Sequence, residues 1–213
     1  MPGYESSVFI NCPFDPEFAP LLEAMIFCVV RAGMTARLAS ESLEAGQSRL
    51  EKIISLIENC KYSIHDLSRA VSKKKGEAFR MNMPFELGLD MGRRRAPDNL
   101  RSDKKFVVFE HVPYELKRCL SDLNGVDVQF HRSNVDQVLK KVKDFLRVEA
   151  GRPLPGAAAL EQEYYTFLGW MTEKKIFEGH TEDEAKDLPT QERLDEMVGW
   201  NALNRPSVYG PVF

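Results

Sequence analysis

Two carboxylates lie where the sequence could do chemistry. Asp66 ends the predicted strand Tyr62–Asp66, and Glu86 follows Pro84 at the start of a predicted helix. A carboxylate in a first helical turn is favoured by the helix dipole, so we expect Glu86 to stay ionised near neutral pH. An ionised carboxylate that faces the anomeric carbon of a sugar can act as a nucleophile or stabilise an oxocarbenium-like charge. A second carboxylate can orient or protonate the departing base.

Glu86 and Asp66 are therefore the candidate catalytic residues. Each also has a purely structural alternative, in which Glu86 is an ordinary helix-start glutamate and Asp66 caps the loop that follows it. Other polar and aromatic side chains follow the predicted strands or precede the next helix. The candidate substrate-binding residues are Asn11, Phe14, Asp15, Arg37, Ser68, Arg80 and Asn82. Such amides, carboxylates and one aromatic ring suit a small polar ligand with a flat ring. Arg37, Arg49 or Arg80 could pair with a phosphate, because a guanidinium matches phosphate geometry.

The elements that must position these residues alternate along the chain. The expected strands are Ser7–Asn11, Thr35–Ala39, Tyr62–Asp66, Lys105–Glu110 and Val126–Phe130. The expected helices between and after them are Pro20–Ala32, Arg49–Asn59, Pro84–Gly92, Tyr114–Leu123 and Asn134–Val148. This order predicts an α/β fold, a doubly wound, flavodoxin-like five-stranded parallel sheet over residues 6–149. Open parallel sheets bind ligands at the carboxyl ends of their strands, which is where the candidate residues lie.

A helical extension follows the predicted α/β domain of residues 1–150. The stretch Gly151–Gly156 is typical of a linker, and Ala157–Lys175 and Glu182–Asn201 have helical patterns within the extension of residues 151–213. An apolar stripe runs along the first of these helices through Leu160, Tyr164, Phe167, Leu168 and Met171. Such a stripe must be covered. We predict a homo-oligomer, a two-fold dimer with this helix in or beside the interface, and the alternative is a tail folded back on its own sheet.

Composition excludes several classes of protein. The formal charge of −3 argues against a general nucleic-acid binder. No apolar run approaches the ~20 residues of a membrane span, and the N-terminus lacks a signal-peptide pattern, so we expect a cytoplasmic protein without membrane contact. The four cysteines Cys12, Cys28, Cys60 and Cys119 have no metal-ligand spacing, and we expect them to be small buried hydrophobes with no metal site. We expect the run Lys73–Lys75 to be a solvated loop, and no Rossmann, Walker A or hydrolase motif is present.

Three segments carry a family resemblance. The run Val8–Asp15 resembles the first strand and loop of TIR domains and of nucleoside 2-deoxyribosyltransferases. The run Ile64–Ser68 is similar to the transferase strand that carries a base-binding aspartate. The run Asn82–Gly88 resembles both the transferase segment that holds the catalytic glutamate and the TIR segment W-C-x-x-E-L. The whole pattern looks like a bacterial group of TIR-like proteins of unassigned activity that is associated with defence against phage.

The resemblance implies an enzyme that cleaves the N-glycosidic bond of a nucleotide, a nucleoside or NAD. Glu86 would be the nucleophile or stabiliser and Asp66 would orient the base or ribose, with NAD as a possible substrate and no cofactor. The alternative is a non-catalytic module that binds a nucleotide signal or assembles as TIR domains do. A phosphorylation receiver is disfavoured, because Asn11 and Cys12 stand where its acidic pair is needed and His131 stands where its lysine is needed.

Overall fold

Five parallel strands form the sheet at the centre of the molecule. The computed structural model describes residues 3–41, 46, 48–69, 80–123 and 125–210. The strands are β1 (Ser7–Asn11), β2 (Thr35–Leu38), β3 (Tyr62–Asp66), β4 (Lys105–Glu110) and β5 (Val128–Phe130), in the order β2-β1-β3-β4-β5. This is the doubly wound, flavodoxin-like arrangement that the sequence predicted. The central strands β1 and β3 are buried along their whole length, as expected for strands with helices on both faces.

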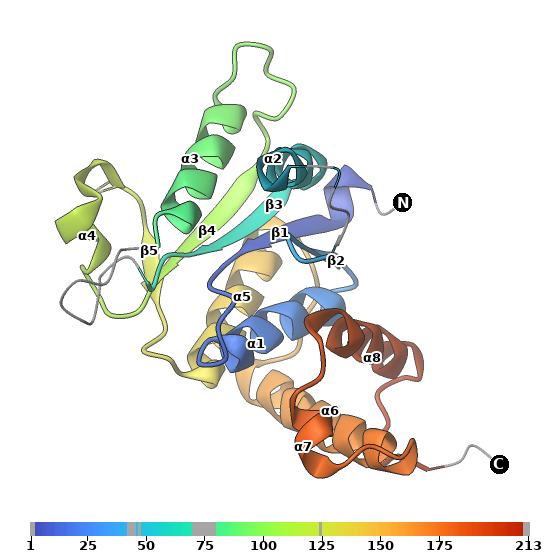
Figure 1. Cartoon of the computed structure of the whole chain (residues 1–213). Coiled ribbons are helices and arrows are strands. Elements are labelled where there is room, and N and C mark those ends of the chain that lie inside the picture. The colour runs from blue at the N-terminus through green and yellow to red at the C-terminus, as the bar shows by residue number, and fades with distance from the viewer. Residues whose placement is uncertain (1–2, 42–45, 47, 70–79, 124, 211–213) are drawn as a thin grey trace.

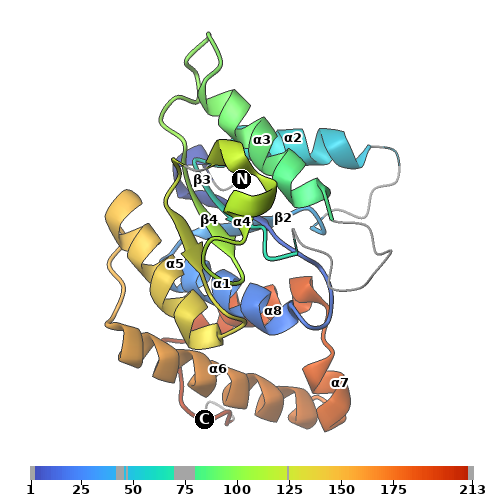
Figure 2. The same ribbon diagram turned by 90° about the vertical axis from the view of Figure 1, so that its left-hand side faces the viewer.

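Helices cover both faces of the sheet (Figures 1 and 2). On one face lie α1 (Ala19–Arg31) and α5 (Val135–Glu149), which share a core with Val8 and Ile10. On the other face lie α2 (Arg49–Asn59) and α3 (Asn82–Arg94), and α4 (Leu116–Cys119) lies beyond them. Phe9, which points opposite to its neighbours Val8 and Ile10, packs against α2. The layers thus follow from the alternation of side chains along β1.

Three turns depart from the regular elements or end them. Short 3₁₀ turns lie at Tyr4–Ser6 and Ser121–Leu123. Gly33 adopts a φ of 67°, a left-handed conformation that favours glycine, just beyond the end of α1. These segments set the lengths of the strands and helices that flank them.

Two predicted helices are wrong in extent. The region Tyr114–Leu123 contains only α4 and a 3₁₀ turn, because Tyr114 has a φ of 70° and its N–H donates to the Glu110 carboxylate rather than into a helix. The predicted helix Glu182–Asn201 is two helices, α7 (Glu182–Lys186) and α8 (Thr190–Ala202). Pro189 precedes α8 and cannot donate a backbone hydrogen bond, so the first helix ends before it.

The C-terminal helices fold back onto the sheet domain of the same chain. Helix α6 (Ala157–Phe177) and helix α8 pack beside α1, where Phe27 contacts the rings of Tyr164, Phe167 and Trp200 at centroid distances of 5.3, 5.8 and 5.9 Å. These aromatic residues belong to the same hydrophobic core as β1. The apolar stripe is therefore covered within the chain. The predicted homo-oligomer stays a prediction, without support from this helix, and so does the division into two units at residue 150.

The cysteine prediction holds for three of the four side chains. Cys12, Cys28 and Cys60 are buried and free, but Cys119 is exposed, because α4 stops there and turns its last residue toward solvent. Within the part of the chain that is described, no helix has the length and apolar character needed to cross a membrane. The predicted loop at Lys73–Lys75 lies outside the described residues.

Candidate functional site

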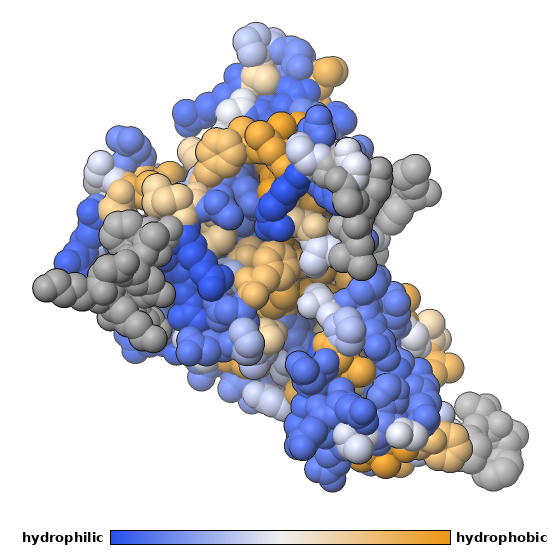
Figure 3. All heavy atoms as spheres, viewed as in Figure 1, coloured by the Kyte–Doolittle hydropathy of each residue, from blue (hydrophilic) through white to orange (hydrophobic). Residues whose placement is uncertain are grey.

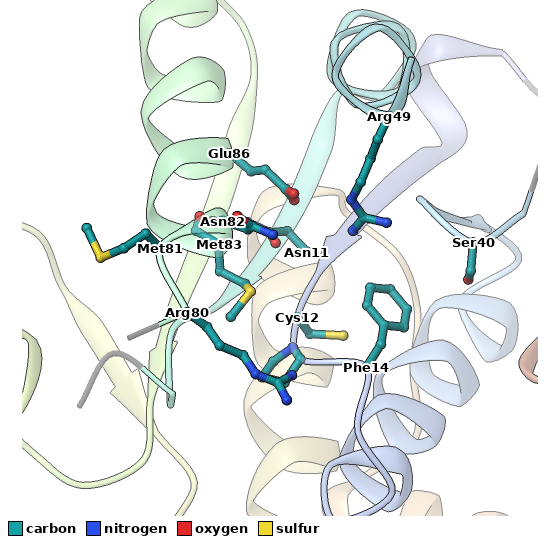
Figure 4. Close-up of a pocket in the computed structure, with 11 residues that line it drawn as sticks. Asn11, Cys12, Phe14, Ser40, Arg49, Arg80, Met81, Asn82, Met83 and Glu86 are labelled. Carbon is teal, nitrogen blue, oxygen red and sulfur yellow. Dashed lines mark hydrogen bonds between the residues drawn. The ribbon is translucent and has the colours of Figure 1, made fainter. Parts of the chain in front are cut away.

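A pocket of about 710 Å³ opens at the carboxyl end of β1 (Figure 4). This volume suits a small organic ligand. The lining residues are Asn11, Cys12, Pro13, Phe14, Ser40, Arg49, Arg80, Met81, Asn82, Met83 and Glu86. They come from the loop after β1, the turn after β2, the start of α2 and the start of α3. The pocket lies beside the strand at which the strand order reverses, where doubly wound sheets bind ligands.

The pocket brings together five of the nine predicted site residues. These are Asn11, Phe14, Arg80, Asn82 and Glu86. Apolar side chains gather near the middle of the face shown in Figure 3, and hydrophilic surface borders them. Phe14 and Met81 are both well exposed for side chains of their size. Prediction from the sequence missed Ser40 and Met81, for which neither residue type nor spacing gave a signal.

Glu86 is a buried acid at the wall of the pocket. Helix α3 begins at Asn82, so Glu86 is its fifth residue and not part of its first turn. Only 5% of its surface is exposed. Burial raises the pKa of Glu86 to about 7, although the positive charge of Arg49 acts in the opposite direction. The expectation that this carboxyl stays ionised near neutral pH is therefore not supported, because burial brings its pKa close to neutrality.

Asp66 does not reach the pocket. Its side chain has no exposed surface, and it is not among the lining residues. One carboxylate oxygen, Oδ1, accepts a hydrogen bond of 3.0 Å from the N–H of Ser68. The other, Oδ2, lies 3.1 Å from Nε2 of His131, near enough for an electrostatic contact but not aligned as a hydrogen bond. The expectation that Asp66 and Glu86 open into one cleft is wrong. The Asp66 carboxylate is fully buried and lies against the ring of His131, which directly follows β5.

Three predicted binding residues also have other partners. Asp15 pairs with Arg69 at 3.0 Å and with Arg80 at 3.3 Å, and so holds Arg80 at the rim of the pocket. Arg37 forms hydrogen bonds of 2.9 and 3.0 Å to the carboxylate of Glu41. Ser68 caps the Asp66 carboxylate through its backbone. None of Asp15, Arg37 and Ser68 lines the pocket.

Two arginines, Arg49 and Arg80, line the pocket. Arg49 is the first residue of α2, which the Ser48–Glu51 capping box starts. Its guanidinium points toward the pocket in Figure 4, and among the described residues it makes no ion pair or hydrogen bond. Helix α3 starts at the pocket without a side-chain cap from its N-cap residue Met81, and because Pro84 has no N–H, its first turn offers the N–H groups of Asn82 and Met83. An uncapped helix start beside arginines attracts an anion.

The described residues offer no metal site, since no group of three or more His, Cys, Asp or Glu side chains among them could hold an ion. Among the described residues that line the pocket, Glu86 is the single acid. The pocket thus combines one carboxyl with a pKa near neutrality, a cationic rim, two amides and an accessible aromatic ring.

The fold and the pocket define a doubly wound α/β protein with a pocket of polar and apolar side chains at the carboxyl edge of its sheet. No protein-family model matches the chain, and the comparisons with curated proteins and with solved structures also gave no match.

Proposed function

We propose that this pocket binds a nucleotide and cleaves its N-glycosidic bond, with Glu86 as nucleophile or electrostatic stabiliser of the anomeric carbon. The observation that carries the proposal is the burial of Glu86 in the wall of a pocket toward which the guanidinium of Arg49 points. The resemblance of Asn82–Gly88 to the glutamate segment of TIR domains and deoxyribosyltransferases supports the same assignment. A buried carboxylate interacts strongly with developing positive charge because water screens it little.

The remaining lining residues have complementary roles in this proposal. Phe14 packs on the base, and Arg49 and Arg80 bind phosphate oxygens. Asn11 and Asn82 bind the sugar hydroxyls. Asp66 is no longer assigned to catalysis, since it lies outside the pocket.

The single carboxyl favours a particular leaving group. Cleavage of a neutral base from a nucleoside usually needs an acid that protonates the base as it departs. The nicotinamide of NAD already carries a positive charge on its ring and leaves as a neutral molecule without a proton. A pocket in which the described residues supply one acid therefore suits NAD as substrate better than a neutral nucleoside.

The experiment that tests the proposal is incubation of the protein with NAD and with a panel of nucleotides and nucleosides. Free base is measured by chromatography. We expect nicotinamide release from NAD, with slower or no release from nucleosides that lack phosphate. Binding of nucleotides without release of any base would contradict the enzyme and would support the alternative, a non-catalytic nucleotide-binding module.

Activity is expected to depend on the ionisation of Glu86. Only the carboxylate can stabilise a cationic anomeric carbon, so kcat/KM for NAD should rise with pH and reach half its maximum near pH 7. NAD is a suitable probe because its diphosphate does not titrate between pH 5 and 9. Rates measured over that range should fit one ionisation. A rate that is flat or that falls over the same range would exclude the carboxylate as the active form.

Replacing Arg49 by methionine should weaken nucleotide binding. A lost charge-assisted hydrogen bond costs about 1.5–3 kcal/mol, so KM for NAD should rise roughly tenfold to a hundredfold. Because Arg49 lowers the pKa of Glu86, the midpoint of the pH profile should also move above 7. The matched control is Arg95→Met, an exposed arginine at the far end of α3. Equal effects of R49M and R95M would show that Arg49 does not bind the ligand.

A further inference from the structure

A row of buried polar side chains runs beneath the pocket. Asn11 lies at the pocket, and its Nδ2 is 3.0 Å from Nδ1 of His65. On the other side of the ring, Nε2 of His65 is 3.1 Å from Oδ2 of Asp90 in α3. Oδ1 of Asp90 lies 3.1 Å from Nζ of Lys104. Each of these four side chains is at most 2% exposed, so no water competes for these contacts.

Asp90 lies at the centre of this row and accepts hydrogen bonds from its neighbours. It receives a hydrogen bond of 2.5 Å from Ser63 and faces His65 and Lys104. Burial alone would raise the pKa of Asp90, but the hydrogen bonds from His65 and Ser63 and the positive charge of Lys104 keep that pKa below its ordinary value. An ionised carboxylate can only accept hydrogen bonds, so the nitrogen of His65 that faces it must carry a hydrogen.

The contacts of His65 then determine whether its second ring nitrogen, Nδ1, carries a hydrogen. The amide of Asn11 donates to the backbone oxygen of Met83 at 2.9 Å, and only Nδ2 can make that bond. The same Nδ2 faces Nδ1 of His65, so Nδ1 must accept and carry no hydrogen. The ring itself cannot turn, because the rings of Phe9 and Phe106 pack against it at centroid distances of 6.0 and 6.1 Å. His65 is therefore a neutral ring with its hydrogen on Nε2.

Both hydrogens of the Asn11 amide are used by Met83 and His65. The side chain has one further polar atom, Oδ1, to present to the pocket that Asn11 lines. We propose that the Asp90–His65 pair fixes the Asn11 amide so that the pocket receives a hydrogen-bond acceptor, and that the ligand donates to it through a sugar hydroxyl. The sugar in this statement rests on the proposed function, whereas the orientation of the amide does not. His65 and Asp90 are positioning residues, since neither lines the pocket.

The orientation can be tested without any ligand. Nitrogen-15 spectra of the full chain distinguish the two ring nitrogens of each of its four histidines, and the variant His65→Asn assigns the signals of His65. We expect the His65 pattern of a neutral ring with hydrogen on Nε2. Hydrogen on Nδ1, or a charged ring at pH 7, would overturn the proposal, because Asn11 would then have to turn its amide.

The ligand contact is tested with binding rather than turnover. Calorimetry with the Glu86→Gln variant compares NAD with analogues that carry fluorine in place of the 2′ or the 3′ hydroxyl of the nicotinamide ribose. One of the analogues should bind about tenfold more weakly than NAD, because fluorine cannot donate. Equal affinity for NAD and both analogues would overturn the proposed contact.

A matched pair of His65 variants separates positioning from general damage. Asparagine at position 65 keeps an oxygen that can accept from Asn11, whereas leucine keeps the volume without an acceptor. The tenfold discrimination should persist when His65→Asn is added to Glu86→Gln and should vanish when His65→Leu is added. Identical behaviour of the two variants would contradict the positioning role. If NAD does not bind at all, the proposed function fails, and the nitrogen-15 spectra still decide the orientation of Asn11.

Discussion

Replacing Glu86 by glutamine is expected to lower the rate of base release by about a hundredfold to a thousandfold, while NAD binds with nearly unchanged affinity. Glutamine keeps the shape of the side chain but is neutral at every pH, so it cannot stabilise the positive charge that develops at the anomeric carbon. The loss should therefore appear in kcat and not in KM. Rates and binding constants measured on the same preparations test this split.

The matched control for that variant is Glu110→Gln. Glu110 is also buried at the carboxyl edge of the sheet, but its carboxylate accepts hydrogen bonds from the N–H groups of Tyr114 and Leu116 outside the pocket. This variant should lose stability and keep its kcat. Equal losses of kcat in E86Q and E110Q would show that the activity reports only on the fold.

Glutamine at position 86 should also stabilise the protein above neutral pH. The folded-state pKa of about 7 lies above the ordinary 4.5, so between these values the folded chain binds more protons than the unfolded chain. The free energy of unfolding of the wild type should therefore fall as pH rises from about 4.5 to 7, by at most about 3 kcal/mol. The E86Q variant should not show this fall in the free energy of unfolding, because glutamine does not ionise. Denaturant unfolding should show that E86Q is more stable than the wild type at pH 8 and equally stable near pH 4. An E86Q variant less stable than the wild type at pH 8 would show that burying the Glu86 charge costs no stability.

The second large effect is expected far from the pocket, at Phe167 in α6. Phe167 has no exposed surface and contacts Phe27 and Trp200. Replacing it by alanine should lower the free energy of unfolding by about 3–5 kcal/mol, a large part of the stability of a typical domain. The reason is that the side chains of α6 and α8 complete a hydrophobic core with α1, and Phe167 lies within that core.

The same helix provides the control. Phe177→Ala removes an identical ring that is 73% exposed and contacts only Tyr209 among the described aromatic residues. We expect a loss of at most about 1 kcal/mol, measured by the same denaturant unfolding. A Phe167→Ala variant as stable as Phe177→Ala would show that α6 is not part of the core.

The sequence predicted the strands better than the site. The limits of β1, β3 and β4 agree with the prediction to the residue. The helices α2 and α6 were equally clear from their apolar periodicity. The order and direction of the strands then followed from the alternation of strands and helices.

The partners of the charged groups could not be predicted in this way. Asp66 and His131 end different strands, and only the sheet order brings them within contact distance. Arg37 looked available for a phosphate, but the turn after β2 places Glu41 against it. The ionisation of Glu86 depends on how much of its surface is buried. That burial follows from the position of Glu86 in α3, which begins at Asn82. Residue type and spacing therefore indicated the edge of the sheet at which the pocket lies but not which carboxyl lines it.

The central claim, that Glu86 faces the glycosidic bond of a nucleotide, is tested most directly by a crystal structure of the E86Q variant with NAD bound. The account predicts the anomeric carbon of the nicotinamide ribose within about 3.5 Å of the side chain at position 86, a distance at which reaction is possible. The diphosphate should contact Arg49. NAD bound with its glycosidic bond turned away from position 86, or bound outside this pocket, would contradict the account.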